Sequence, residues 1–357
     1  MIPVEDKTAL QAQMLANRLQ KRFRHLKKWA QRSGVSAFRL YDRDIPEIPL
    51  VLDFYGDFTA KAACADLKDA ALSGALYKRP YEKDEADESN WLSAMKESVS
   101  FALGIKLENI FIKQREKQRG ASQYEKMGKV RAEKIVIESG LQFKVNLSDY
   151  LDTGLFVDRR LLRAMVRNAA SGKKVLNLFS YTGSFSVYAA SGGAASTDSV
   201  DISNTYLNWS RENFLLNGFS AEISRRSFTA NRTNQHELIR EDVLEFIKNA
   251  VREKLQWDVI IVDPPAFSNS KRMIGNFDLN RDLIELLSQC LRLLSKEGKM
   301  FVSVNVKRGA LQAEEMETGL RSSAVKNVHV TDVSSQIEDE DFKGRKTPKA
   351  FLIDKEK

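Results

Sequence analysis

The amino-acid sequence predicts an α/β protein, in which a mostly parallel sheet with helices on both faces follows a smaller α+β region. From residue 173 onward, short apolar strands alternate with amphipathic helices, a pattern typical of parallel sheets. Before residue 150, a long basic helix and closely spaced strands replace this alternation. We therefore expect two domains, 1–150 and 151–357, with a junction near residues 148–155.

The composition is that of a globular protein, with 43% hydrophobic and 29% charged residues in a chain of 357. No apolar run approaches the ~20 residues of a membrane-spanning helix, and the N-terminus shows no secretory signal, so we expect a cytoplasmic protein with no membrane partner. The two cysteines and three histidines are scattered, which argues against a disulfide framework and a metal site. A net charge of +8 is consistent with a polyanionic partner.

The first predicted element is a basic amphipathic helix. Apolar residues recur at helical spacing at Leu15, Leu19, Phe23, Leu26 and Ala30. No acidic residue occurs between Lys7 and Tyr41, and the candidate RNA-binding residues of this helix are Arg18, Arg22, Lys27 and Lys28. An ordinary solvated surface is the alternative interpretation.

Short strands are expected next, at 37–42, 49–58 and 109–114, with a helix at 91–103 before the third. The segments 134–139 and 141–147 predict a hairpin that turns at Ser139-Gly140. Between Lys113 and Lys134 the chain is rich in cations, which favours an exposed basic loop.

The second region supplies the parallel sheet. Strands are expected at 173–180, 194–203, 236–242, 257–265 and 299–306, and helices at 183–193, 204–218, 243–251 and 279–298. Ligands of such sheets bind at the carboxyl ends of the strands.

Four strand ends carry suitable groups. Gly183 opens the helix after the first strand and leaves room for backbone N–H groups to approach a ligand. Asp201 could accept hydrogen bonds from both hydroxyls of a ribose, and Asp242 from an adenine amino group. Each acid alone could equally be a helix N-cap. The spacing G-x-G-x-x-G of nicotinamide dinucleotide sites is missing, so the four ends together favour S-adenosylmethionine.

The fourth strand end, Asp263-Pro264-Pro265, carries the predicted chemistry. The prolines cannot extend the strand and fix the backbone, while Phe267 offers a face on which an extruded base could stack. Lys271 and Arg272 could contact phosphates. An ordinary strand exit, with Phe267 in the core, is the alternative.

The motifs "NLFSYTG", "VDISNTYLNWSRENFLLNG", "DPPAFSNSKRM" and "VNVKRG", with "QYEKMG" and "DYLDTGLFVDRR" upstream, resemble the C-terminal half of the bacterial fused 23S rRNA guanine methyltransferase, which forms N7-methylguanine. The resemblance runs from about Leu15 to the end. It implies a Rossmann-like class I methyltransferase domain, with a mostly parallel seven-stranded sheet, after a smaller substrate-binding domain. Residues 219–236 depart from the family pattern.

The resemblance also implies roles for particular residues. Asn177, Phe179, Tyr181, Thr182 and Gly183 would line the methionine end of the cofactor, Asp201 and Ile202 the ribose, and Asp242 the adenine. The segment Thr153–Arg159, with Gly154, Phe156 and Asp158, would close over the cofactor; a structural linker is the alternative interpretation of this segment. Asp263 would lie at the reaction centre and also contact the cofactor, and Pro264 and Phe267, identified above from the residues themselves, complete the predicted catalytic set. Lys271, Arg272, Lys307 and Arg308 would contact RNA. The partner would be 23S rRNA or its precursor, and we expect a monomer acting with a separate guanine-N2 methyltransferase.

Guanine N7 carries a free lone pair, so its methylation needs placement and charge stabilisation but no general base. The enzymatic alternative is methylation of cytosine C5, which needs a cysteine nucleophile. Cys290 lies on an apolar helix face and is expected in the core, and Cys64 has only Lys61 as a basic neighbour. A non-catalytic RNA-binding or assembly factor with this fold is the third hypothesis.

Overall fold

The chain forms two compact units in the computed structural model. The structure describes residues 4–57, 67–77, 84–115, 132–150, 152–224, 234–265, 267–268, 277–305, 311–323 and 327–355. The first unit comprises Met1–Thr153 together with Glu340–Arg345, and the second comprises Gly154–Asp339 and Lys346–Lys357.

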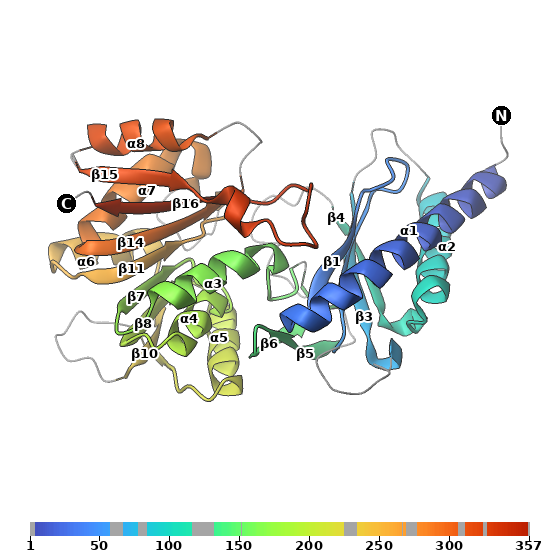
Figure 1. Cartoon of the computed structure of the whole chain (residues 1–357), viewed down its shortest axis with the longest axis horizontal. Helices are drawn as coiled ribbons and strands as arrows, with labels where there is room; N and C mark the ends of the chain where they lie inside the picture. Colours follow the sequence, from blue (N-terminus) through green and yellow to red (C-terminus); the bar gives the residue numbers. More distant parts are fainter. Residues whose placement is uncertain are drawn as a thin grey trace. The chain divides into compact units, whose positions relative to one another are not determined.

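The first unit is built on a four-stranded sheet in the order β1-β2-β3-β4, in which only β3 and β4 run parallel. Its strands are β1 (Ala37–Asp42), β2 (Leu50–Tyr55), β3 (Ala71–Tyr77) and β4 (Ile110–Arg115). The helices α1 (Val4–Ser33) and α2 (Glu85–Leu103) share one hydrophobic cluster with these strands (Figure 1). The five apolar positions predicted for the first helix are all buried, so that prediction is confirmed.

A separate hairpin completes the N-terminal region. Strands β5 (Glu133–Glu138) and β6 (Leu141–Asn146) pair antiparallel. Ser139 and Gly140 have φ angles of 53° and 81°, so both turn residues lie in the left-handed region that matches the twist of a two-residue hairpin. The predicted hairpin is confirmed.

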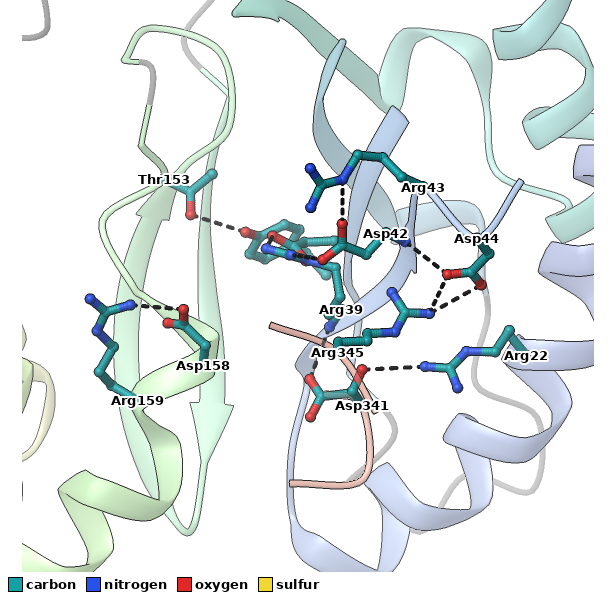
Figure 2. Close-up of polar contacts among 12 residues, drawn as sticks. Arg22, Arg39, Asp42, Arg43, Asp44, Thr153, Asp158, Arg159, Asp341 and Arg345 are labelled. Atoms are coloured by element: carbon teal, nitrogen blue, oxygen red, sulfur yellow. Dashed lines mark hydrogen bonds and ion pairs between the residues drawn. The ribbon is translucent and has the colours of Figure 1, made fainter. Parts of the chain in front are cut away.

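Residues 340–345, which come from the far end of the sequence, belong to the first unit. The carboxylate of Asp341 accepts the backbone N–H of Arg39 at 2.9 Å, and its carbonyl accepts a bond from Arg22 at 3.2 Å (Figure 2). The guanidinium of Arg345 pairs with Asp44 at 2.9 Å. Charged and polar groups therefore hold both ends of this segment within the unit.

The second unit contains an eight-stranded sheet in the order β15-β16-β14-β11-β7-β8-β10-β9, in which only the two pairings of β16 are antiparallel (Figure 1). Its strands are β7 (Lys174–Leu178), β8 (Ser196–Asp201), β9 (Glu222–Ser224), β10 (His236–Arg240), β11 (Trp257–Val262), β14 (Leu294–Val304), β15 (Val328–Asp332) and β16 (Lys349–Lys355). The predicted α/β class is confirmed. The count of seven strands is corrected, because the short strand β9 pairs parallel with β10 at the edge of the sheet.

Helices cover both faces of this sheet. They are α3 (Arg160–Ala169), α4 (Ser184–Ser191), α5 (Asn204–Leu216), α6 (Val243–Arg252), α7 (Leu279–Leu293) and α8 (Ala313–Ser322). Along β11, Ile260 and Val262 join a cluster with α6, α7 and α8, whereas Val259 and Ile261 join a cluster with α3 and α4. Successive residues of a strand point to opposite faces, so a continuous apolar run is buried on both sides.

Candidate active site

The candidate site lies at the carboxyl end of β7. This strand pairs parallel with β8 on one side and with β11 on the other, so the order of the strands reverses at this point of the sheet. Ligands of open α/β sheets bind at such a reversal of strand order. The turn after β7, the residues after β8 and the residues after β11 therefore meet at one edge.

The turn from β7 to α4 has an unusual backbone. Phe179, Tyr181 and Gly183 have φ angles of 56°, 50° and 75°, and the left-handed region costs a residue with a side chain about 1–2 kcal/mol. A Cβ atom on Gly183 would lie 2.0 Å from the hydroxyl of Ser210. Glycine is therefore required here for two reasons, the backbone angle and the close approach of α5, while the predicted reason, room for a ligand to approach the backbone, stays a prediction. Strain of this kind gathers at functional sites.

Asp201, at the end of β8, is tied to this turn. One carboxylate oxygen accepts the backbone N–H of Tyr181 at 3.0 Å, and the other accepts that of Ser203 at 2.8 Å. Burial raises the pKa of Asp201 to about 6, although these two hydrogen bonds act to lower it. A carboxylate oxygen can accept more than one bond, so Asp201 retains capacity for ribose hydroxyls. The neighbouring Ile202 is partly buried.

Asp242 caps a helix. Its Oδ1 accepts the backbone N–H groups of Leu244 at 3.0 Å and Glu245 at 3.2 Å, at the start of α6. The N-cap interpretation that the sequence left open therefore holds for this oxygen. Both bonds go to the same atom, so the cap does not use Oδ2, which could accept from an adenine amino group.

Asn177 and Thr182 serve the packing around the turn. The amide of Asn177 is buried within β7 and donates to the hydroxyl of Ser186 at 2.9 Å. Thr182 donates to the carbonyl of Gly154 at 2.6 Å, and its own carbonyl accepts from Asn213 at 2.9 Å. These side chains hold the turn and the neighbouring segment in place.

The segment 154–159 lies against this turn, and its predicted closure over the cofactor stays a prediction. Gly154 has a φ of 97°, and a Cβ there would lie 2.2 Å from the ring of Trp209. The ring of Phe156 lies 5.3 Å from that of Tyr181. Arg163 of α3 donates to the carbonyl of Phe156 at 2.9 Å, so the segment is anchored on both sides.

Arg159, which sequence analysis named only as the end of the segment 153–159, joins this segment to Asp263. It donates from Nε and Nη2 to the two carboxylate oxygens of Asp263, each at 3.3 Å. A third bond joins Nη1 to Asp158 at 2.7 Å (Figure 2). Burial acts to lower the pKa of Arg159, but the two carboxylates more than offset it, so the pKa is raised. The only sequence signal was its position in "DRR", where it is one of two adjacent arginines.

The loop after β11 is described in part. Pro264 is buried and Asp263 is partly buried. The backbone of β12 (Phe267–Ser268) pairs with β13 (Phe277–Asp278). The side chain of Phe267 and the residues Lys271, Arg272, Lys307 and Arg308 lie outside the described part of the chain. The same holds for Cys64, for most of the basic loop 113–134 and for 225–233 within the departing segment.

The basic helix divides into two sets of cations. Arg18 pairs with Asp44 at 2.7 Å and Arg22 donates to Asp341, so both serve internal contacts of the first unit. Lys27 is partly buried and Lys28 is exposed. Between residues 18 and 32, the exposed Lys and Arg side chains are Lys21, Arg24, Lys28 and Arg32, and we call these four the outer face of α1.

Cys290 is fully buried in the apolar cluster around α7, and burial raises the pKa of its thiol. The expectation that it is a core residue is confirmed. In the described residues, no cluster of three metal-ligating side chains occurs, and no helix is long and apolar enough to cross a membrane.

The site fits S-adenosylmethionine. The hydroxyls of Ser180 and Ser210 are buried beside the turn and make no hydrogen bond within the described residues, although buried polar groups are normally paired. Together with Asp201 they offer polar groups for a ligand without phosphates. The strand order and these groups define a class I S-adenosylmethionine-dependent methyltransferase.

The comparisons with known proteins identify the family. Residues 59–341 match the model of an S-adenosylmethionine-dependent methyltransferase family. The chain is 41% identical to ribosomal RNA large subunit methyltransferase K of Neisseria meningitidis serogroup B, over 95% of this chain and 86% of that protein. It therefore belongs to the S-adenosylmethionine-dependent methyltransferases, in the family that includes this protein, and S-adenosylmethionine is its cofactor.

Two further similarities fit this assignment. Ribosomal RNA large subunit methyltransferase K/L of a Shewanella species is 41% identical over 85% of this chain. The matched region covers only 39% of that protein's length. A solved methyltransferase structure from Streptococcus mutans superposes with a TM-score of 0.67 at 23% identity, covering 96% of this chain and 81% of the other. The latter likeness supports the fold alone.

Proposed function

We propose that this protein transfers a methyl group from S-adenosylmethionine to N7 of a guanine in 23S rRNA. The similarity to large subunit methyltransferases K and K/L supports the RNA substrate. The choice of guanine N7 rests on the resemblance of the motifs and on the chemistry of the site.

One observation carries the chemical part of the proposal. At the end of β11, the buried guanidinium of Arg159 lies between the carboxylates of Asp158 and Asp263, so the three side chains carry one negative charge in excess. S-adenosylmethionine supplies an electrophilic methyl group. An N7-methylated guanine carries a positive charge, and a fixed negative charge beside it stabilises the transition state in which that charge develops.

The thiols argue against cytosine C5. Attack at that carbon requires a thiolate, and the thiol of Cys290 is buried in the apolar core. Cys64 lies outside the described residues, and its substitution tests whether it takes part. Asp201, Asp242 and the segment 154–158 would hold the cofactor, with Asp263 at the acceptor.

The outer face of α1 would bind RNA phosphates. Replacing Lys21, Arg24 and Lys28 with alanine should weaken binding to 23S rRNA fragments. It should also flatten the salt dependence of binding, by about 0.7 to 0.9 log units for each phosphate that these cations neutralise in the parent protein. Affinity for S-adenosylmethionine should not change.

A matched control exists on α6 and just after it. Replacing Lys248, Arg252 and Lys254 also removes two lysines and one arginine from exposed positions, and it should leave RNA affinity unchanged. Equal effects of the two triple variants would show that net charge, not the outer face of α1, determines binding.

The decisive experiment is methylation of 23S rRNA transcripts, followed by nucleoside mass spectrometry and by mapping of the modified position through cleavage at N7-methylguanine. We expect N7-methylguanine at one position. Formation of 5-methylcytosine, or RNA binding without any methyl transfer, would refute the proposal in favour of one of the two alternatives.

A further inference from the structure

The contact between Arg159 and Asp263 has the hydrogen-bonding pattern of a guanine. Nε and Nη2 of an arginine are two parallel donors on one edge of a planar group. They meet the two oxygens of Asp263 at 3.3 Å each. The N1–H and N2–H₂ groups of guanine present the same two parallel donors on a planar edge. Among the four RNA bases only guanine has this pair, because N1 of adenine and N3 of cytosine carry no hydrogen and the N3–H of uracil lies between two carbonyl groups.

We propose that the guanidinium of Arg159 occupies the position at the Asp263 carboxylate that the target guanine takes on binding. The base then displaces the guanidinium from this carboxylate. This inference rests on the proposed function, because it takes guanine as the acceptor. It assigns Asp263 the recognition of the N1–H and N2–H₂ edge, and Arg159 a positioning role.

The distances show which contact of Arg159 is replaceable. Charge-assisted bonds between a guanidinium and a carboxylate are normally about 2.7–2.9 Å long. The bond to Asp158 has a length of 2.7 Å, whereas both bonds to Asp263 are longer, at 3.3 Å. Asp158 is also the neighbour of Arg159 in the chain. The guanidinium can therefore leave Asp263 without losing its stronger partner.

The ring of Phe156 gives the displaced group a second support. The guanidinium carbon of Arg159 lies 5.1 Å from the centre of this ring, within the range of cation–π attraction. Arg159 is only 4% exposed, and a buried cation deprived of all partners would be costly. Because Asp158 and Phe156 stay with it, the exchange at Asp263 leaves no unpaired cation.

The exchange also favours the reaction. Methylation at N7 makes the N1–H group of guanine more acidic, so its bond to the carboxylate of Asp263 strengthens as the methyl group is transferred. A contact that is stronger in the transition state than in the bound substrate raises the rate. The methylated base is a cation, and it then lies beside Asp263 in place of the guanidinium of Arg159.

The first test uses the parent enzyme and an rRNA fragment in which the mapped guanine is replaced by inosine, which keeps N1–H and N7 but lacks the N2 amino group. Loss of one bond to a charged acceptor should lower kcat/KM about 10- to 150-fold. Dimethyl sulfate treatment of both fragments corrects for the intrinsic reactivity of N7. Equal corrected kcat/KM values for the two fragments would overturn the inference.

The second test uses Arg159→Lys, which keeps a cation for Asp158 but cannot make two parallel bonds. If Arg159 competes with the base, KM for the guanine fragment should fall severalfold, and the preference for guanine over inosine should remain. An unchanged or higher KM would refute displacement. In Asp263→Asn, the preference should disappear.

Failure of this inference differs from failure of the proposed function. If the parent enzyme forms no N7-methylguanine, the proposed function itself is wrong. If it forms N7-methylguanine but treats guanine and inosine alike, only the recognition by Asp263 is wrong.

Discussion

The ring of Phe342 should stabilise the first unit more than any local sequence pattern suggests. It is 1% exposed, and the guanidinium of Arg39 lies 5.1 Å from its centre. Truncation of a buried phenylalanine costs about 3–5 kcal/mol, and loss of the cation–π interaction adds to this. We therefore expect Phe342→Ala to lower the free energy of unfolding of this unit by about 4 kcal/mol.

Hydrogen exchange with mass spectrometry tests this prediction, because it reports on each region separately. Amides of β1 and α1 should exchange faster in Phe342→Ala, since Arg39 and Arg22 contact the same segment. The matched control is Phe101→Ala on α2, whose ring is 86% exposed and whose removal should cost less than about 0.5 kcal/mol. If the amides of the first unit are equally protected in both variants, residues 340–345 do not stabilise it.

Three further predictions concern Asp201, Gly183 and the two cysteines. Because the pKa of Asp201 is raised to about 6, its carboxyl should be mostly protonated at pH 5, and calorimetry should find S-adenosylmethionine bound about tenfold more weakly there than at pH 7.5. Gly183→Ala should abolish the thermal shift by S-adenosylmethionine, whereas Gly172→Ala, with a similar φ of 68° but no atom within 4 Å of the added Cβ, should keep it at a cost of about 1–2 kcal/mol. The double variant Cys64→Ser, Cys290→Ala should retain methyl transfer; a folded but inactive variant would support a thiol mechanism.

The regular elements could be predicted because their signals are local. The spacing of apolar residues correctly predicted which face of α1 is buried, and Ser139-Gly140 correctly predicted the turn of the hairpin. Strand β3 was missed, since Gly74 interrupts its apolar run. The structure gives the reason for that glycine: a Cβ there would lie 2.2 Å from the carbonyl of Val51, so it serves the pairing with β2.

The features that sequence analysis missed depend on partners far along the chain. Asp341 and Phe342 lie in an acidic stretch that is typical of a surface, yet both are buried against residues some 300 positions earlier. Arg159 gains its partner at Asp263 in the same way. The predicted RNA-binding residues include Arg18 and Arg22, whose side chains bind Asp44 and Asp341. The helical pattern of the sequence could not reveal these partners.

Asp201 and Asp263 show how one residue type can serve two chemistries. The described donors to Asp201 are two backbone N–H groups, and its raised pKa indicates that its charge is incompletely stabilised. Neutral ribose hydroxyls can supply that stabilisation without bringing a charge. Asp263 instead faces a guanidinium, so its surroundings already suit a planar, positively charged group.

This difference predicts opposite kinetic effects of the same substitution. Asp201→Asn should weaken S-adenosylmethionine binding about 10- to 150-fold and largely retain kcat at saturating cofactor. Asp263→Asn should leave the dissociation constant of the cofactor unchanged but lower kcat about 10²- to 10³-fold, the effect of removing one group that stabilises a developing charge. Calorimetry and single-turnover methylation separate the two quantities. If Asp263→Asn instead weakened cofactor binding at full kcat, the carboxylate would belong to the cofactor and not to the base, because a group that acts on the developing charge cannot be removed without slowing the transfer.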